Sequence, residues 1–163
     1  MPEIDPQSRP ARLEDLDRIC ALNVQVHSFH LAENPLRYRE LHADDPRLRA
    51  HHRRCIEDPD TVLMVRCDPE GLVVGYLLAR WRVFEDSPFL NDAVELHVDQ
   101  IVVDAEHRGQ GHGQELLDRA MRAARGQGAD RLSLGVAIFN DRARKMFERV
   151  GFQVIGRVMV RRA

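Results

Sequence analysis

The sequence of 163 residues lacks the features that mark secreted, metal-binding or membrane-spanning proteins. Its three cysteines, Cys20, Cys55 and Cys67, are odd in number and have no CxxC spacing. They predict buried thiols in a reducing compartment rather than disulfides or metal ligands. No apolar run approaches the roughly 18–20 residues that cross a bilayer, and the acidic start Met1-Pro2-Glu3-Ile4-Asp5 lacks the layout of a signal peptide. We therefore expect a cytoplasmic protein without a membrane partner.

An excess of charge of either sign is also missing, because 24 Lys and Arg residues stand against 26 Asp and Glu, with a formal net charge of −2. A protein that binds phosphate backbones normally carries a strong basic excess, so this balance argues against a nucleic-acid partner. The sequence has no repeat, low-complexity tract or linker. With 44% hydrophobic and 31% charged residues, the composition is that of a globular protein, and the length fits one domain over residues 1–163.

The pattern of apolar residues predicts helices first and strands afterwards. Helices are expected at about 13–30 and 48–57, with an irregular stretch at 32–45 between them. The turn Asp68-Pro69-Glu70-Gly71 joins two runs rich in β-branched and apolar residues into a hairpin. Strands are expected at 7–10, 61–67, 72–83, 95–103, 131–137, 152–155 and 157–160, with helices after residue 113 and from residue 140. This order indicates an α/β or α+β sheet with one parallel crossover.

The sharpest motif is the run Arg108-Gly109-Gln110-Gly111-His112-Gly113, which lies between a predicted strand and an amphipathic helix. Alternate glycines let the backbone turn its N–H groups toward one point, and no Cβ blocks a ligand. The helix N-terminus adds unpaired N–H groups and the positive end of the helix dipole. The run therefore predicts a site for a dianion such as pyrophosphate. Arg108 either adds charge there or braces the turn.

Other glycine-rich sites fit this run less well. A P-loop needs GxxxxGK[ST], and no Lys-Ser or Lys-Thr pair is present here. A dinucleotide site has GxGxxG, but the third glycine comes one residue early, and Asp130 precedes a strand rather than ending one. A structural turn and a protein that binds another diphosphate nucleotide are the alternatives.

A second motif begins at Asn140, after the next predicted strand. The run Asn140-Asp141-Arg142-Ala143-Arg144-Lys145-Met146-Phe147-Glu148-Arg149-Val150-Gly151-Phe152 is similar to Asn-x-x-Ala-x-x-x-Tyr/Phe-x-x-x-Gly-Phe. Arg108, Gly111 and Gly113 match the pattern Arg/Gln-x-x-Gly-x-Gly/Ala. In this order the two patterns resemble those of the GNAT superfamily of acyl-CoA N-acyltransferases. The resemblance covers the chain from Leu72 to the C-terminus.

The resemblance implies an α/β (α+β) fold with a mixed, mostly antiparallel sheet of six to seven strands. A central, splayed parallel pair and about four flanking helices belong to the same expectation. It also implies acetyl-CoA as the acyl donor, with pantetheine in the splay and pyrophosphate on the glycine loop. No metal is expected, because the histidines have no carboxylate or cysteine partners at ligand spacing. By position, the residues expected to bind acetyl-CoA are Ile101, Val102, Val103, Arg108, Gly109, Gln110, Gly111, His112, Gly113, Asn140 and Phe147. An equally good interpretation of Asn140 is a helix N-cap.

The strand before the glycine loop carries three ionisable residues at alternate positions. Glu95, His97 and Asp99 are therefore expected on one face of the strand. An ammonium acceptor must lose a proton before it attacks a thioester, so a base with a suitable pKa is needed. Asp99 is nearest the expected thioester and His97 has the most suitable intrinsic pKa, so both rank ahead of Glu95. A solvated or edge face is the alternative.

Phe147 departs from the pattern of the family. Many members carry a tyrosine at this position as the general acid, and a phenyl ring cannot donate a proton. Either another group protonates the leaving thiolate, or CoA leaves as the thiolate. Phe147 itself is expected in the helix core.

The resemblance predicts an N-acetyltransferase that acts on a primary amine of a small molecule or peptide. The alternative, which Phe147 favours, is a non-catalytic sensor or structural module that binds acyl-CoA. Members of the family often dimerise through their C-terminal strands, so the apolar residues 154–160 are expected to allow a homodimer.

Overall fold

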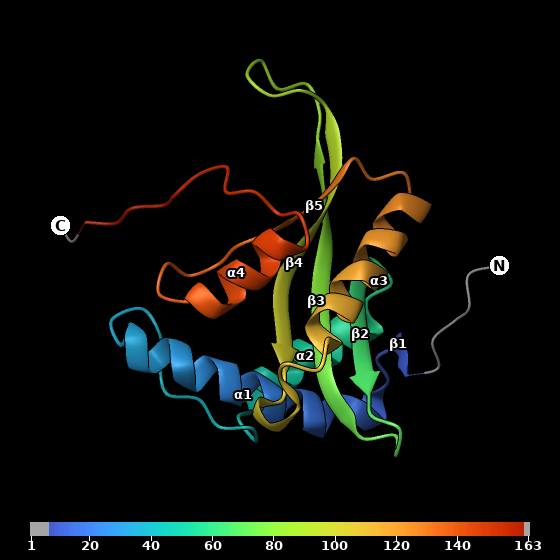
Figure 1. The fold of residues 1–163 in the computed structure, drawn as a ribbon, viewed down its shortest axis with the longest axis vertical. Helices are drawn as coiled ribbons and strands as arrows, with labels where there is room; N and C mark the ends of the chain where they lie inside the picture. The colour runs from blue at the N-terminus through green and yellow to red at the C-terminus, as the bar shows by residue number, and fades with distance from the viewer. Residues whose placement is uncertain (1–6, 162–163) are drawn as a thin grey trace.

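The computed structural model describes residues 7–161, and a five-stranded sheet forms its centre (Figure 1). The acidic start at residues 1–5 lies outside the described residues. The strand order is β1-β2-β3-β4-β5, with antiparallel pairing up to β4 and parallel pairing between β4 and β5. The strands are β1 (Ser8–Pro10), β2 (Thr61–Cys67), β3 (Val73–Phe84), β4 (Ala93–Val103) and β5 (Arg131–Leu134).

Four α-helices and two short 3₁₀ turns complete the structure, as the sequence pattern predicts for the helices. These are η1 (Leu13–Asp15), α1 (Leu16–Glu33), α2 (Pro46–Glu57), η2 (Ala105–His107), α3 (His112–Gly126) and α4 (Asp141–Arg149). Asp45 accepts a hydrogen bond from the N–H of Arg47 and caps α2, whose first residue is Pro46.

The helices cover the two faces of the sheet in pairs. Ile19 of α1 and Cys55 of α2 pack against one face in a cluster that includes Tyr76. Leu116 of α3 and Phe147 of α4 pack against the opposite face. The apolar stripe predicted for α3 is therefore confirmed, and side chains of β4 face a different pair of helices on each side of the sheet.

The parallel pair β4–β5 is present, but it lies at the edge of the sheet instead of its centre. Its register runs from Glu95 opposite Arg131 to Val98 opposite Leu134 and ends there. β5 is shorter than the predicted 131–137, because Gly135 follows Leu134 and glycine has no side chain to pack on a sheet. The chain then leaves β4 and leads to α4 (Figure 1).

The prediction of six to seven strands is wrong, because residues 152–155 and 157–160 form no strand in the described part of the chain. Figure 1 shows this C-terminal segment running away from the sheet. Its apolar side chains are exposed, namely Val154, Ile155, Val158, Met159 and Val160. β-branched residues favour strands only where a neighbouring strand can take their backbone hydrogen bonds, and this segment has no such neighbour within residues 7–161.

A bulge interrupts the alternation along β4. Leu78 of β3 faces Gln100, but the next residue, Ala79, faces Val98, so Asp99 is the additional residue. Val98 and Ile101 pack on the α3 side, whereas Asp99 and Gln100 both bond to side chains on the α1–α2 side. The bulge thereby places two polar side chains in succession on one face.

Gly75 sits where β3 approaches β4 too closely for any side chain. A Cβ at this position would lie 2.8 Å from the carbonyl oxygen of Val102. We expect Gly75→Ala to lower the free energy of unfolding by about 1–3 kcal/mol, because the backbone of β4 must shift. Urea unfolding checks this.

Gly126→Ala is the matched control, because a Cβ there meets nothing within 4 Å. Alanine at the end of α3 is expected to leave stability unchanged or slightly higher. Equal stability of the two variants would contradict the close approach at Gly75.

Candidate functional site

The glycine loop connects the end of β4 to the N-terminus of α3, as predicted. Gly109 and Gly111 have φ angles of 81° and 85°, and Gly111 is the N-cap of α3. This left-handed backbone favours glycine. The first intrahelical bond joins the N–H of Glu115 to the carbonyl of Gly111. The N–H groups of the residues between them are therefore available at the end of the helix.

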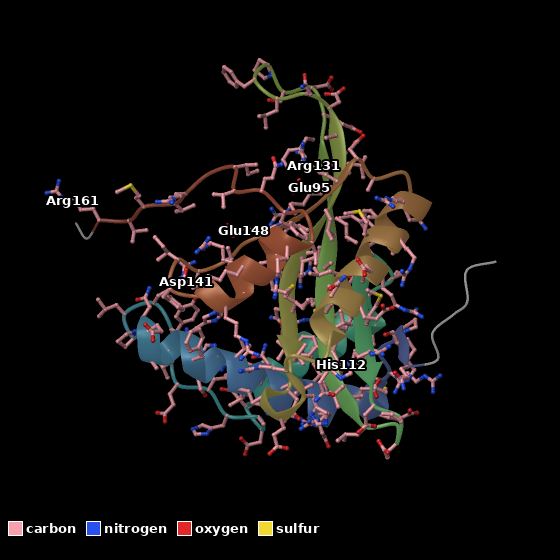
Figure 2. The ribbon with its side chains drawn as sticks, in the orientation of Figure 1. Glu95, His112, Arg131, Asp141, Glu148 and Arg161 are labelled. Atoms are coloured by element: carbon pink, nitrogen blue, oxygen red, sulfur yellow. The ribbon has the colours of Figure 1, made fainter. Side chains whose placement is uncertain are left out.

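Arg108 braces the loop, which is one of the two roles considered for it. Its Nε donates to the carbonyl of Val103 at 3.0 Å. His112 is the first residue of α3, and Figure 2 shows it at the foot of that helix. Nε of Arg66 lies 3.4 Å from its Nδ1. Burial, and then the charges of Arg66 and His107, lower the pKa of His112. Arg66 and Arg108 thus bring cationic side chains next to the loop, which suits an anion.

Asp104 anchors the start of the loop to α1 and β3. Its carboxylate accepts hydrogen bonds from Arg18 and from Nε2 of Gln25, the latter at 3.2 Å. Its own N–H donates to the carbonyl of Val74 at 2.8 Å, and Gln25 also accepts from the N–H of Ala105 at 3.1 Å. This anchor leaves no local signal in the sequence, because its residues lie about 80 positions apart.

The edge of β4 on the β5 side is open beyond Val98 within the described residues. Ile101 and Val103 are half-buried along it, and Val102 is buried. A strand edge without a partner presents unpaired N–H and C=O groups. These residues therefore offer backbone donors and acceptors to an extended ligand.

Two residues of the second motif lie at the N-cap and in the last turn of α4. Asn140 is the N-cap, since its Oδ1 accepts from the N–H of Ala143 at 3.2 Å. Phe147 is 5% exposed and its ring packs edge-on to Phe152 at 5.8 Å. The core role expected for Phe147 is confirmed. A contact of either residue with a cofactor stays a prediction.

The structure brings Glu95, His97 and Asp99 together on the α1–α2 side of the sheet. Ser133 of β5 donates to Oε1 of Glu95 at 2.9 Å and lies 2.7 Å from Nδ1 of His97. Nε2 of His97 lies 3.9 Å from Oδ1 of Asp99. Arg131 donates to Oε2 of Glu95 at 2.8 Å, and Figure 2 shows these two side chains close together. The three β4 residues thus form one connected group.

The electrostatic surroundings of Glu95 and His97 differ. Burial would raise the pKa of Glu95, but hydrogen bonds from Arg131 and Ser133 outweigh it, so the pKa is lowered. Burial, and then the charge of Arg82, lower the pKa of His97, although Asp99 and Glu95 oppose this. Glu95 is thus a carboxylate and His97 a neutral imidazole at pH 7.

A buried polar cluster holds β4 just after the bulge. Oε1 of Gln100 accepts from the hydroxyl of Tyr76 at 2.8 Å and from Asn23 at 3.2 Å. Nε2 of the fully buried His52 lies 3.2 Å from the same oxygen. Side chains from α1, α2 and β3 therefore fix this point of β4. The cluster could not be predicted from the sequence, because it depends on contacts between four elements.

Across residues 7–161, no three His, Cys, Asp or Glu side chains are grouped to hold a metal ion. Over the same residues, no helix is both long and apolar enough to cross a bilayer.

Known proteins resemble this chain in sequence and in fold. The model of the acetyltransferase (GNAT) family matches residues 23–152. A mycothiol acetyltransferase of Propionibacterium freudenreichii subsp. shermanii is 30% identical over 144 residues, which are 88% of this chain and 42% of that protein. The chain spans about two fifths of the length of the mycothiol acetyltransferases it matches.

A shorter relative and a solved structure are also similar. A putative ribosomal protein bS18-alanine N-acetyltransferase of Bacillus subtilis is 26% identical over 145 residues, covering 89% of this chain and 79% of that protein. The crystal structure of a tetramutant of the BH1408 protein from Bacillus halodurans superposes with a TM-score of 0.89 at 18% identity, covering 96% and 99% of the two chains. That likeness shows a common fold.

The anchor at Asp104 predicts how stability depends on pH. Burial would raise the pKa of Asp104, but hydrogen bonds from Gln25 and Arg18 outweigh it and lower the pKa below 3.8. The folded protein therefore holds this proton less tightly than the unfolded chain, and the stabilisation is present above about pH 4 and lost as the pH falls. We expect Asp104→Asn to lower the free energy of unfolding by about 1–2 kcal/mol at pH 7.

Urea unfolding at pH 7 and at pH 3 measures this difference, which should shrink at pH 3. Asp118→Asn, at an exposed position of α3, is the control and should change stability by less than about 0.5 kcal/mol. If the stability difference between the wild type and Asp104→Asn grew toward pH 3, the predicted direction of the pH dependence would be wrong.

Proposed function

The chain belongs to the acetyltransferase (GNAT) family, and we propose that it transfers an acetyl or short acyl group from acetyl-CoA to a primary amine. One observation carries the proposal. β4 parts from β5 directly after Val98, beside His97 and Asp99, and its far end leads into the glycine loop and the N-terminus of α3. The same strand therefore carries a basic side chain and a candidate site for an extended thioester.

The residues proposed to hold acetyl-CoA fit its chemistry. Pyrophosphate is a dianion, and the loop offers backbone N–H groups, a helix N-terminus and the nearby charges of Arg66 and Arg108. The amides of pantetheine suit the open edge of β4 at Ile101 and Val103. When bound, acetyl-CoA supplies a thioester carbonyl that an amine can attack.

We propose His97 as the first of the three candidate bases. Asp99 is held by Nη1 of Arg80 at 2.7 Å, and Glu95 is held by Arg131. His97 is neutral and can accept a proton from the ammonium of the acceptor. The neutral amine then forms the C–N bond as the C–S bond breaks. The second proton of the amine nitrogen passes to water, and CoA leaves as the thiolate.

Phe147 supports a second candidate function. It is buried in the core at the position where many members of the family carry the acidic tyrosine. A protein that binds acyl-CoA as a sensor or structural ligand, without turnover, needs no such acid. For the enzyme, we propose that CoA leaves as the thiolate or takes its proton from water.

The acceptor is proposed to be an amine of a small molecule or a peptide. The relatives are named for mycothiol in one case and for an alanine of a ribosomal protein in the other, so both classes belong in the substrate panel. The acceptor is expected on the α1–α2 side of β4, because the proposed bases lie on that face.

Thiol release from acetyl-CoA over such an amine panel tests the proposed activity. We expect His97→Gln to lower kcat/KM by about 100-fold or more, because a positioned general base contributes that much. The pH profile of the wild type should fall on its acid side with a pKa below 6.5, since the pKa of His97 is lowered from that value. This acid limb should be lost in His97→Gln.

His42→Gln, the same change at an exposed histidine of the α1–α2 connection, is the control. A thermal shift with CoA but no thiol release with any amine, in the wild type as in His97→Gln, would favour the sensor. A shift with NAD or ATP and none with CoA would overturn both functions.

We also propose that two copies of the chain associate through the C-terminal segment, residues 152–161. Five large apolar side chains are exposed along it, and Ile155 is 95% exposed. The outer edge of β5 has no strand partner within the described residues. An apolar extended segment and an open strand edge in the same chain are complementary, because a strand pair satisfies both.

Light scattering after size exclusion measures the association. We expect a dimer for the wild type and a shift toward monomer for Ile155→Asp. Gln153→Asp adds the same charge at an exposed polar position of the segment and should leave the dimer intact. A wild-type monomer at micromolar concentration would contradict the proposal.

A further inference from the structure

Ser133 of β5 links two of the ionisable residues of β4 and belongs to neither sequence motif. It faces His97 in the β4–β5 register, so its hydroxyl lies between two side chains that alternate along the neighbouring strand. Its Oγ is 2.9 Å from Oε1 of Glu95 and 2.7 Å from Nδ1 of His97. Both distances are those of hydrogen bonds.

The direction of these hydrogen bonds follows from the charge of Glu95. This side chain is 7% exposed and is paired with Arg131 at 2.8 Å, with Arg82 at 3.8 Å. Two guanidinium groups keep the carboxylate ionised, so it only accepts hydrogen bonds. The single hydroxyl proton of Ser133 is therefore donated to Glu95. Toward His97, Ser133 can only accept, and Nδ1 of His97 must carry a proton.

We propose that Ser133 is a positioning residue that fixes the tautomer of His97. Nδ1–H donates to the hydroxyl, and Nε2 is left unprotonated as the base. The inference rests on the proposed acetyltransferase function. One proton moves from the ammonium of the acceptor to Nε2, while Nδ1 keeps its proton and Glu95 stays ionised. The resulting imidazolium faces two carboxylates, at Glu95 through Ser133 and at Asp99, 3.9 Å from Nε2.

Positively and negatively charged side chains surround His97 and act on its pKa in opposite directions. Arg82 of β3 opposes the imidazolium, while Glu95 and Asp99 of β4 favour it. Arg80 holds Asp99 at 2.7 Å, and Arg131 holds Glu95. These ion pairs partly neutralise the two carboxylates. His97 therefore stays uncharged until it takes a proton from the acceptor.

Nitrogen-15 NMR of the imidazole rings of the full chain reads the tautomer directly, without acetyl-CoA or an acceptor. Above the pKa of His97, we expect Nδ1 protonated and Nε2 unprotonated in the wild type, and loss of this tautomer in Ser133→Ala. In the thiol-release assay, Ser133→Ala should lower kcat by about 10- to 100-fold, with the KM for acetyl-CoA unchanged and the acid limb moved to lower pH.

Ser133→Thr keeps the hydroxyl and should restore both the tautomer and most of kcat. Ser87→Ala makes the same chemical change in the β3–β4 connection and should alter neither. A protonated Nε2 in the wild type, or a Ser133→Ala protein with unchanged tautomer and kcat, would overturn the proposal. A correct tautomer in a wild type that releases no thiol overturns the proposed function and leaves the positioning role of Ser133 standing.

Discussion

β4 pairs with β3 from end to end, apart from the bulge at Asp99, but with β5 only as far as Val98, and the candidate site depends on this difference. The paired half holds Glu95 and His97 against Ser133 of the neighbouring strand. The unpaired half keeps its backbone groups open and ends in the glycine loop. A sheet that paired β4 fully on both sides would close the edge at which an extended ligand can bind.

The remaining structure keeps this half-paired strand in place. The cluster of Gln100, Tyr76 and Asn23 fixes β4 just beyond the bulge. Asp104, bonded to Arg18, fixes the point where the strand turns into the glycine loop. Both fixed points are tied to α1, a helix that carries neither motif, and to β3.

The sequence predicted those parts of the site whose conformation depends on a few neighbouring residues. Gly109 and Gly111 take left-handed backbone angles that few other residues tolerate, so the loop was readable from the sequence. Asn140 caps α4, as its residue type and position indicate. The three polar positions of β4 lie on one face, as predicted, but the sequence did not locate the bulge at Asp99, because the bulge depends on the register against β3.

The sequence by itself determined the order of the elements, the glycine loop and the second motif, because backbone preference and apolar periodicity are encoded within a few neighbouring residues. Only the tertiary structure decided which of the ionisable residues of β4 are charged. Ser133 and Arg131 reach Glu95 from a strand about 36 positions away, and their hydrogen bonds make it an ion-paired carboxylate while His97 stays neutral. It also decided that residues 152–161 form no strand, since strand formation needs a partner edge that no local pattern can supply.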